Sequence, residues 1–390
     1  MEVRTELYWE STNKFGEELC GDKVEAVQSP EETIMVMADG LGSGVKANIL
    51  STLTTKIALT MLREGSSIEE TVKTIMATLP ICKIRKIAYS TFTIIRVDLQ
   101  GNCYIVEYGN PPVMLLRDGK VLRLEGTTRE IDGKEVKEYR LRVQRDDVFI
   151  AMSDGVVHAG VGGILNLGWQ WENIAQYIEK ISKVETTIAS LVKLLSEATM
   201  NFYLDMPGDD ATIVALKIIS PQFVTVFAGP PQNPDDDEKV VNHLIEKPGK
   251  KIVCGGTAAQ IVARVLDREI KTSTNFVDPT IPPIAWIKGI DLVTEGVLTL
   301  DRTCKILTRF KDTDVQYSEL RQLQQQKDGA SRLAMFLLNA TDITFLLGKA
   351  INPAHQNPGF PKNLSIKLNI VKELVDILDK MGKHIEIVYY

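Results

Sequence analysis

The sequence predicts two domains: an α+β domain over residues 1–220, followed by a smaller α/β domain over residues 221–390. In the first part hairpin turns join strand-like runs, which is typical of an antiparallel sheet. In the second part strands and helices alternate, which is typical of a mainly parallel sheet. The 390 residues are also about twice the length of a usual domain. The predicted boundary lies at Ser220-Pro221, and no internal repeat relates the two parts.

The first domain is expected to combine antiparallel strands with two pairs of helices. Glycine and asparagine tolerate the positive φ of tight turns, so Gly101-Asn102 and Asp118-Gly119 indicate hairpins. Helical patterns at 44–62 and 67–78 form one pair, and those at 171–181 and 185–200 form another. Runs rich in β-branched or aromatic residues predict strands at 3–8, 33–38, 91–98, 103–108, 113–116, 148–152 and 212–218. This order predicts helices layered on an antiparallel core.

The second domain alternates between the two kinds of element. Strands are expected at 224–227, 251–254, 343–347 and 384–388, and helices up to about 245, at 257–267 and at 370–381. Asp291, Thr294 and Glu295 are interpreted as a further helix start, because acidic residues there favour the helix dipole. The loop 352–361, which carries His355, is rich in proline. It is expected to be either a fixed surface loop or a functional one.

Gly255, Gly256 and Thr257 connect a strand to a helix, with Thr257 as the expected N-cap. Free backbone N–H groups at a helix start attract anions, so a nucleotide or phosphate could bind there. The competing interpretation is a tight strand-to-helix connection. It is favoured because this motif is weaker than the established phosphate-binding loops.

Composition excludes several classes of protein. An apolar fraction of 44%, a charged fraction of 25% and a mean hydropathy of -0.02 are ordinary for a globular protein. A net charge of -6 and a pI near 5.5 disfavour a nucleic-acid partner. The five cysteines are scattered without a C-x-x-C pair, which argues against disulfides and thiolate zinc sites. No signal peptide or membrane span is predicted, so we expect a cytoplasmic protein that does not bind membranes.

Acidic residues beside glycines at predicted strand ends are the main functional signal. Asp39 and Asp154 each follow an apolar strand and precede a glycine, where the backbone can approach a ligand closely. Asp22 lies in CGDK, and Asp209-Asp210 lies in PGDDAT. A single Asp-Gly pair is usually a turn, but the recurrence after buried-looking strands favours one convergent site. Carboxylates, a backbone carbonyl and waters are the ligands of Mg²⁺ and Mn²⁺, so this set predicts a metal centre.

Five motifs in order carry a family resemblance. They are GDK at 21–23, ADGLGSG at 38–44, STFTIIRVDLQGNCYIVEYGNPPVMLLRDGKV at 90–121, SDGV at 153–156 and GDDATIVAL at 208–216. With them, residues 1–218 resemble the metal-dependent type 2C protein phosphatases, in particular the bacterial branch of stage II sporulation protein E. The resemblance implies a β-sandwich flanked by helix pairs, with two Mn²⁺ or Mg²⁺ ions at one end.

The resemblance also implies roles for individual residues. Asp39 would bridge the two ions, and the carbonyl of Gly40 would complete one of them. Asp154 and Asp209 would bind the second ion, whereas Asp22 would hold the first directly or through its waters. Asp39 and Asp154 are thus the expected catalytic residues. A water activated by the ions would attack phosphorus in line, without a covalent phosphoenzyme.

The sequence gives weaker evidence for a further metal ligand, a phosphate-binding residue and a general acid. Asp210 stands where the family often has Asn or Asp, so it ranks below Asp209 as a metal ligand. No phosphate-binding residue is assigned, and Lys14 and Lys46 are the weak candidates. His158 is either a general acid or a polar loop residue, with the loop residue favoured. Residues 160–163 (GVGG) are expected to form a mobile loop.

In the related phosphatases the two helices after the ADG motif act as a switch, and the resemblance assigns this role to residues 44–78. The simpler interpretation is a pair of amphipathic helices that pack on the core, and the same helices can do both. The predicted function is therefore a phosphoprotein (Ser/Thr) phosphatase gated by residues 221–390, which would bind a small-molecule or protein regulator. Its partner is a phosphorylated protein, and a homodimer is left open. One alternative is a catalytically silent scaffold or ligand sensor, but the joint presence of Asp39, Asp154 and Asp209 argues against it. Another alternative is a second enzymatic activity in residues 221–390.

Overall fold

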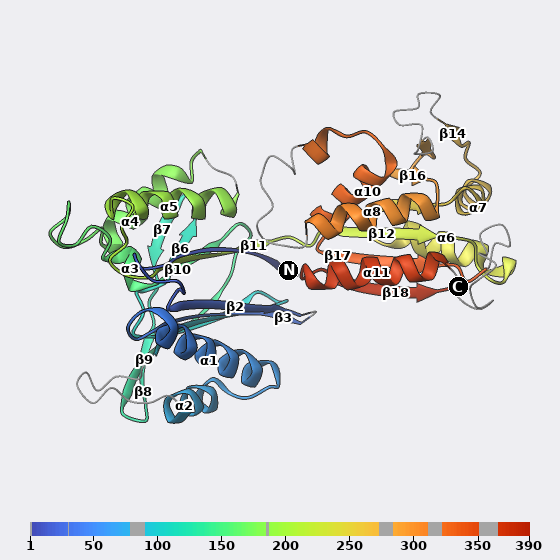
Figure 1. Ribbon diagram of the computed structural model, residues 1–390. Coiled ribbons are helices and arrows are strands. Elements are labelled where there is room, and N and C mark those ends of the chain that lie inside the picture. Colours follow the sequence, from blue (N-terminus) through green and yellow to red (C-terminus); the bar gives the residue numbers. More distant parts are fainter. Residues whose placement is uncertain are drawn as a thin grey trace. The chain divides into compact units, whose positions relative to one another are not determined.

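The computed structural model describes residues 2–29, 31–78, 90–184, 187–272, 284–310, 322–350 and 366–390. The chain folds into two compact units, Met1–Ser220 and Pro221–Tyr390 (Figure 1). Each unit has its own hydrophobic core. No helix within these described ranges is both long and apolar enough to cross a membrane.

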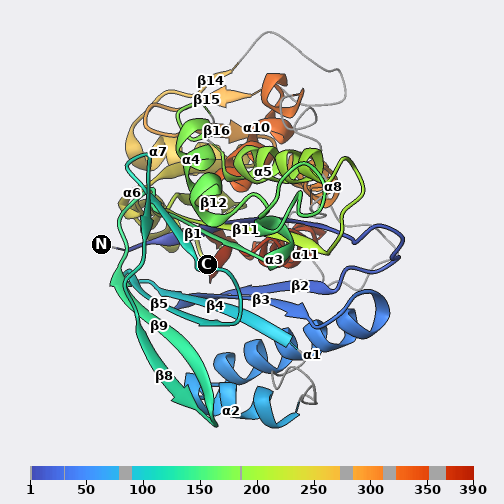
Figure 2. The same ribbon diagram turned by 90° about the vertical axis from the view of Figure 1, so that its left-hand side faces the viewer.

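Two antiparallel sheets face each other in the first unit (Figure 2). The six-stranded sheet has the order β2 (Asp22–Gln28), β3 (Glu32–Gly40), β4 (Ser90–Asp98), β5 (Asn102–Tyr108), β9 (Lys134–Arg142) and β8 (Thr127–Ile131). The five-stranded sheet has the order β1 (Arg4–Thr12), β11 (Ala211–Ile219), β10 (Val148–Met152), β6 (Met114–Arg117) and β7 (Lys120–Arg123).

A pair of helices covers the outer face of each sheet. Strand β3 shows why both faces are apolar: Met35 and Met37 point between the sheets, whereas Ile34 and Val36 pack under α1 (Gly44–Arg63) and α2 (Ile68–Thr78). Helices α4 (Trp171–Ile181) and α5 (Ile188–Phe202) cover the five-stranded sheet in the same way. Each fully buried side chain of this kind contributes about 1.5–3 kcal/mol. The predicted β-sandwich flanked by helix pairs is confirmed.

Four strands of the first unit were not predicted: β2, β7, β8 and β9. Strand β8 has the sequence TTREI and exposes its first four side chains, because it lies at the edge of its sheet. Charged residues likewise interrupt β9, KEVKEYRLR. Neither β8 nor β9 therefore has the continuous apolar run from which the other strands were predicted.

The second unit is an α/β domain with a mainly parallel sheet, as predicted, and the structure shows that the sheet is doubly wound. Its parallel strands lie in the order β16 (Leu292–Thr294), β13 (Lys250–Cys254), β12 (Phe223–Ala228), β17 (Asp342–Leu347) and β18 (His384–Tyr389). Two short antiparallel strands, β14 (Lys271–Thr272) and β15 (Ala285–Trp286), extend the sheet beyond β16. Counted along the chain, the parallel strands have the order 3-2-1-4-5, so the winding direction reverses between β12 and β17.

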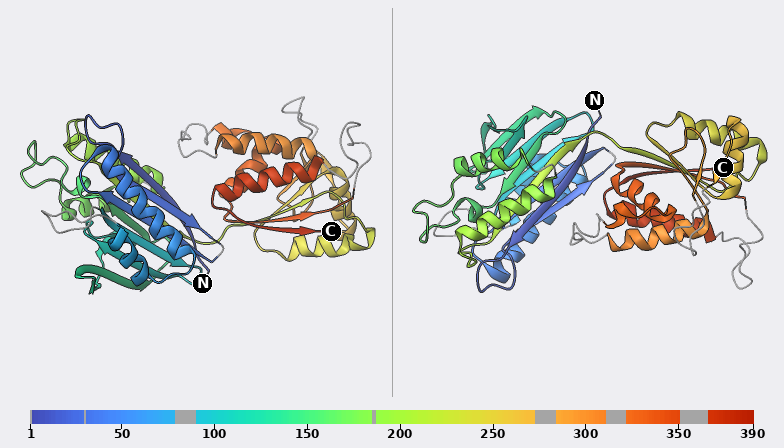
Figure 3. Two further views of the ribbon diagram at one scale, coloured as in Figure 1. Left: turned by 60° about the horizontal axis from the view of Figure 1, so that its bottom comes forward. Right: turned by 90° about the horizontal axis from the view of Figure 1, so that it is seen from above.

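Helices cover both faces of this sheet (Figure 3). Helices α6 (Asp237–Glu246) and α7 (Gly256–Leu266) pack against one face. The other face carries α8 (Val297–Arg309), α10 (Gly329–Asn339) and α11 (Ile366–Lys380).

Two local predictions in this unit were wrong. Residues 292–294 form strand β16, and α8 begins only at Val297, where the Glu295 carboxylate accepts from the backbone N–H groups of Leu298 and Thr299. The N-cap of α7 is Gly255, with a φ of 115° that favours glycine, and Thr257 lies inside the helix. The predicted loop at 352–361, with His355, lies outside the described residues.

The close approach of β3 to α1 should make Gly40 intolerant of a side chain. A Cβ at Gly40 would lie 2.0 Å from the carbonyl oxygen of Ala47, so the backbone of α1 would have to move. We expect Gly40→Ala to lower the free energy of unfolding by about 2–3 kcal/mol, measured by urea denaturation. Gly163→Ala is the control, because its Cβ would meet the nearest oxygen at an ordinary 3.6 Å. Equal stability of the two variants would contradict the packing.

Candidate metal centre

Five aspartates meet at one end of the β-sandwich. Strands β2 and β3 are antiparallel neighbours, and Asp22 lies directly opposite Asp39. Strands β10 and β11 are also antiparallel neighbours, so Asp154, just after β10, and Asp209 and Asp210, just before β11, reach a common end. The two sheets thereby bring together residues that are far apart in the chain.

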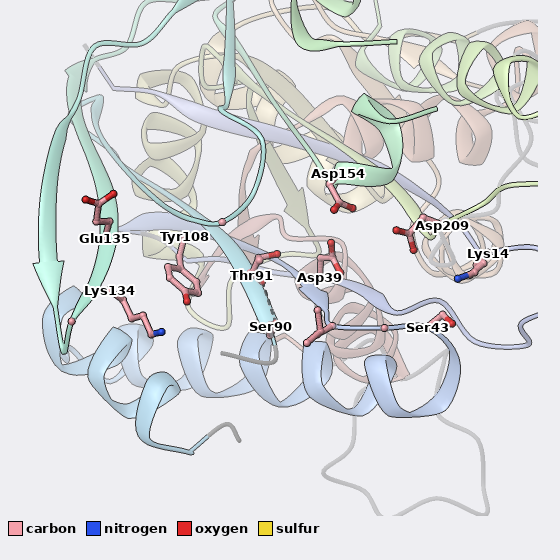
Figure 4. A pocket seen from close by; sticks show the side chains of 14 residues that line it. Lys14, Asp39, Ser43, Ser90, Thr91, Tyr108, Lys134, Glu135, Asp154 and Asp209 are labelled. Atoms are coloured by element: carbon pink, nitrogen blue, oxygen red, sulfur yellow. Dashed lines mark hydrogen bonds between the residues drawn. The ribbon is translucent and has the colours of Figure 1, made fainter. Parts of the chain in front are cut away.

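Three of these aspartates line a cleft of about 680 Å³: Asp39, Asp154 and Asp209 (Figure 4). Asp22 and Asp210 lie behind it, with only 3% and 4% of their surface exposed. The rest of the lining consists of Lys14, Leu41, Gly42, Ser43, Ser90, Thr91, Tyr108, Gly109, Gly133, Lys134 and Glu135. The predicted ligands therefore divide into a group that reaches the cleft and a buried group, to which Gly40 also belongs.

The glycines beside the aspartates allow the protein's own backbone to pack closely. A Cβ at Gly155 would lie 2.0 Å from the carbonyl oxygen of Asp210, and one at Gly21 would lie 2.7 Å from the Asp210 carboxylate. The sequence argument assigned the glycines beside Asp39 and Asp154 to contact with a ligand. The structure shows that Gly155 lets the loops of Asp154 and Asp210 approach each other, whereas Gly40 lets β3 approach the backbone of α1.

Asp22 is the most buried of the group, and neither of its carboxylate oxygens has a hydrogen-bond partner among the described residues. Burial raises the pKa of Asp22 from an ordinary 3.8 to about 7. The charges of Asp210 and Asp154 add to this shift, and the nearby hydroxyls of Ser153 and Thr212 oppose it. A carboxylate in this setting lacks the compensation that buried charges normally have.

Asp39 lies at the centre of the negative charge. Burial raises the pKa of Asp39 to about 9, and the charges of its four neighbours Asp22, Asp154, Asp209 and Asp210 add to the shift. The pKa of Asp209 is also raised, first by burial and then by the charge of Asp154. The site therefore disfavours further negative charge unless a cation enters it.

Lys14 brings a positive charge to the same end of the cleft. Figure 4 shows its side chain beside Asp209, and its charge acts to lower the pKa of that residue. Its backbone N–H donates to Asp210 Oδ1 at 3.0 Å, while the buried Oδ2 of Asp210 has no partner among the described residues. One ammonium does not balance five carboxylates, so the negative charge remains in excess.

The residues present fit a divalent cation. No three His, Cys, Asp or Glu side chains in the described part of the chain are close enough to hold an ion by themselves. Mg²⁺ and Mn²⁺ do not require such a cage, because they bind through one or two carboxylates, carbonyls and retained waters. The unpartnered buried oxygens of Asp22 and Asp210 are the atoms that such an ion would compensate.

Other predicted residues fall outside the cleft lining, namely Lys46 and His158. Sequence reasoning missed Ser90, Thr91, Tyr108 and Lys134, which line it. Ser90 and Thr91 begin β4 and Tyr108 ends β5, so each occupies a strand end of the kind that marked the aspartates. Lys134 gave no such signal, because the strand that it begins was not predicted.

Comparisons with known proteins match part of this chain. The family model described as stage II sporulation protein E matches residues 29–219. Stage II sporulation protein E of Priestia megaterium is 25% identical over 214 residues, covering 53% of this chain and 35% of the relative. The protein of the same name from Bacillus subtilis (strain 168) is 29% identical over 127 residues, covering 31% of this chain and 15% of the relative. This chain thus spans about a third or less of the curated relatives that it matches.

Solved structures with a similar arrangement include a PP2C phosphatase domain with a fragment of the regulatory domain of SpoIIE from Bacillus subtilis. It has a TM-score of 0.48 and 23% identity, covering 56% of this chain and 63% of that chain. A second is the catalytic domain of the serine/threonine phosphatase PstP in complex with two manganese ions. It has a TM-score of 0.41 and 16% identity, covering 56% of this chain and all of that chain.

Residues 29–219 thus resemble a stage II sporulation protein E domain of the type 2C phosphatase class.

The metal-free protein should lose stability as the pH rises. A carboxyl group whose pKa is higher in the folded state than in the unfolded state binds a proton more tightly in the folded state. Its contribution to the free energy of unfolding is therefore complete below about pH 4. That contribution is lost between pH 4 and the folded values of about 7 for Asp22 and about 9 for Asp39. Urea denaturation in EDTA across this range should show the decline, and Asp39→Asn should flatten it. A stability that rises over the same range, or an equal slope in the variant, would contradict this assignment.

Proposed function

We propose that this chain is a metal-dependent phosphatase that hydrolyses phosphoserine and phosphothreonine monoesters in proteins, and that its second unit gates this activity. The observation that carries the proposal is the cleft in which Asp39, Asp154 and Asp209 converge in front of two buried aspartates. The match of residues 29–219 to the family model of stage II sporulation protein E supports it.

In this proposal the aspartates hold two Mn²⁺ or Mg²⁺ ions. Asp39 is paired across the sheet with Asp22 and lines the cleft together with Asp154 and Asp209, which suits it to bridging, and the buried Asp210 would support the group. When bound, such ions supply a hydroxide nucleophile near neutral pH and neutralise charge on the phosphoryl oxygens. Lys14 adds a cation beside Asp209, where it would bind a phosphoryl oxygen.

Among the described cysteines, Cys20 is the one whose pKa responds to two aspartates of the site, and its state agrees with attack by water. Burial raises the pKa of Cys20 to about 12, and the charge of Asp22 adds to this shift. A thiol in this environment stays protonated near neutral pH and is a poor nucleophile. The proposal therefore assigns no covalent phosphoenzyme to this site.

The gating role rests on the topology of the second unit. In doubly wound sheets, ligands bind beyond the carboxyl ends of the strands, where the winding reverses. That position lies at the ends of β12 and β17. We propose that a regulator bound to this unit alters the activity of the first.

Phosphate release from a phosphoserine peptide and from p-nitrophenyl phosphate tests the proposed function. We expect release that requires Mn²⁺, and we expect Asp39→Asn and Asp154→Asn to lower the rate by a factor on the order of 100 or more. These changes keep the shape of the side chain but remove the negative charge that would hold the ions. Far-ultraviolet circular dichroism of each variant checks that the fold is retained.

Two results would contradict parts of this proposal. Failure of the folded wild type and of a chain ending at Ser220 to release phosphate with Mn²⁺ would favour the silent scaffold. Equal rates for the full chain and the shorter chain, across a panel of nucleotides and other small anions, would remove the gating role.

Lys14 offers a separate test of phosphate binding. Because its ammonium lies beside Asp209 in the cleft, we expect Lys14→Ala to raise the KM for p-nitrophenyl phosphate about 10-fold, while Lys14→Arg retains most of the affinity. Lys46→Ala is the matched control, since Lys46 does not line the cleft. If the Lys14→Ala and Lys46→Ala variants had the same KM, Lys14 would not bind phosphate.

A further inference from the structure

The cleft extends well beyond the aspartates. Its lining passes from Asp39 over Thr91 and Tyr108 to Lys134, as Figure 4 shows. On the proposed function, the phosphoryl group occupies the end with the aspartates. The remaining length therefore faces a different part of the same substrate.

The far end of the cleft is formed by the tip of the β8–β9 hairpin. The pairing of β9 with β5 starts at Lys137, opposite Glu107, and β5 ends at Tyr108. Residues 131–136 therefore continue past the end of β5, and residues 133–135 among them line the cleft. A tight turn at Asp132 and Gly133, with φ values of 49° and 72°, places Lys134 at this overhang.

The overhanging tip is held in place by packing and by charge. Ile131 and Val136, which flank the turn, have 2% and 0% of their surface exposed and belong to the core beneath α1 and α2. In the middle of β8, Arg129 forms ion pairs with Glu69 of α2 and with Glu138 of β9. A side chain on such an anchored tip has a defined position relative to the metal end.

The side chains at the tip differ in direction. Figure 4 shows Lys134 extending from the hairpin toward the hydroxyl end of Tyr108, whereas Glu135 turns away from the Lys134 ammonium. The distal end of the cleft thus presents a cation and an aromatic ring. This chemistry complements a carboxylate on an extended peptide.

We infer that Lys134 is a specificity-determining residue that binds an acidic side chain near the phosphorylated residue of the substrate. The substrate class is then a phosphoprotein segment in which aspartate or glutamate accompanies phosphoserine or phosphothreonine. This inference rests on the proposed function. It concerns the choice among substrates and assigns no part of the chemical step to Lys134.

A peptide scan with charge reversal tests it in the full-length protein. Phosphoserine peptides carry one Glu, Gln or Lys at each position from three before to three after the phosphoserine. The readout is the ratio of kcat/KM between the Glu and Gln peptides, so a general loss of activity in a variant cancels. We expect a ratio of about 5–10 at one position for the wild type, which falls below 1 in Lys134→Glu.

Lys137→Glu is the matched control, because Lys137 is exposed on the same hairpin and does not line the cleft. It should keep the wild-type ratio, and added salt should reduce that ratio because an accessible ion pair is screened. An unchanged ratio in Lys134→Glu, or a wild type indifferent to Glu, would overturn the inference while leaving the phosphatase intact. Failure of the wild type to hydrolyse any of these peptides would overturn the proposed function as well.

Discussion

Buried negative charge without a matching cation is the constraint on which the first unit depends. Asp22 and Asp210 are almost fully enclosed, and three of their carboxylate oxygens have no hydrogen-bond partner among the described residues. Such groups destabilise a fold unless they are protonated or paired with a positive charge. The raised pKa of Asp39 has the same origin, because burial and four neighbouring carboxylates all act on it. The fold retains this arrangement although Lys14 supplies only a single ammonium at the site.

The architecture explains how so much charge is brought to one place. Antiparallel pairing puts the end of β3 beside the start of β2, and the end of β10 beside the start of β11. The cores between and outside the sheets are apolar, so the cost of the acidic end is offset by packing elsewhere. Gly21 and Gly155 then let the acidic loops approach Asp210 without side-chain clashes, and Gly40 lets the end of β3 approach α1. The cleft is therefore a product of strand order and register as much as of the aspartates themselves.

The sequence predicted those site residues that a short local pattern marks. Asp39 and Asp154 were identified because an apolar strand followed by Asp-Gly is visible within about ten residues, and the ordered motifs added Asp22, Asp209 and Asp210. Lys134 and Tyr108 were missed because only the register between β5 and β9 brings them to the same cleft. Local patterns also misplaced the start of α8, since three residues of β16 are too short to show a strand period.

The most direct test of this account is a calorimetric titration of the EDTA-treated full-length protein with Mn²⁺. The account predicts saturable binding by the wild type and its loss in folded Asp39→Asn, because that substitution removes the carboxylate at the centre of the cluster. Binding should also raise the melting temperature, since the ion binds the folded state and compensates its buried charge. Wild-type protein that is folded yet does not bind the ion, or a variant that binds it equally well, would contradict the claim that these aspartates form a metal centre.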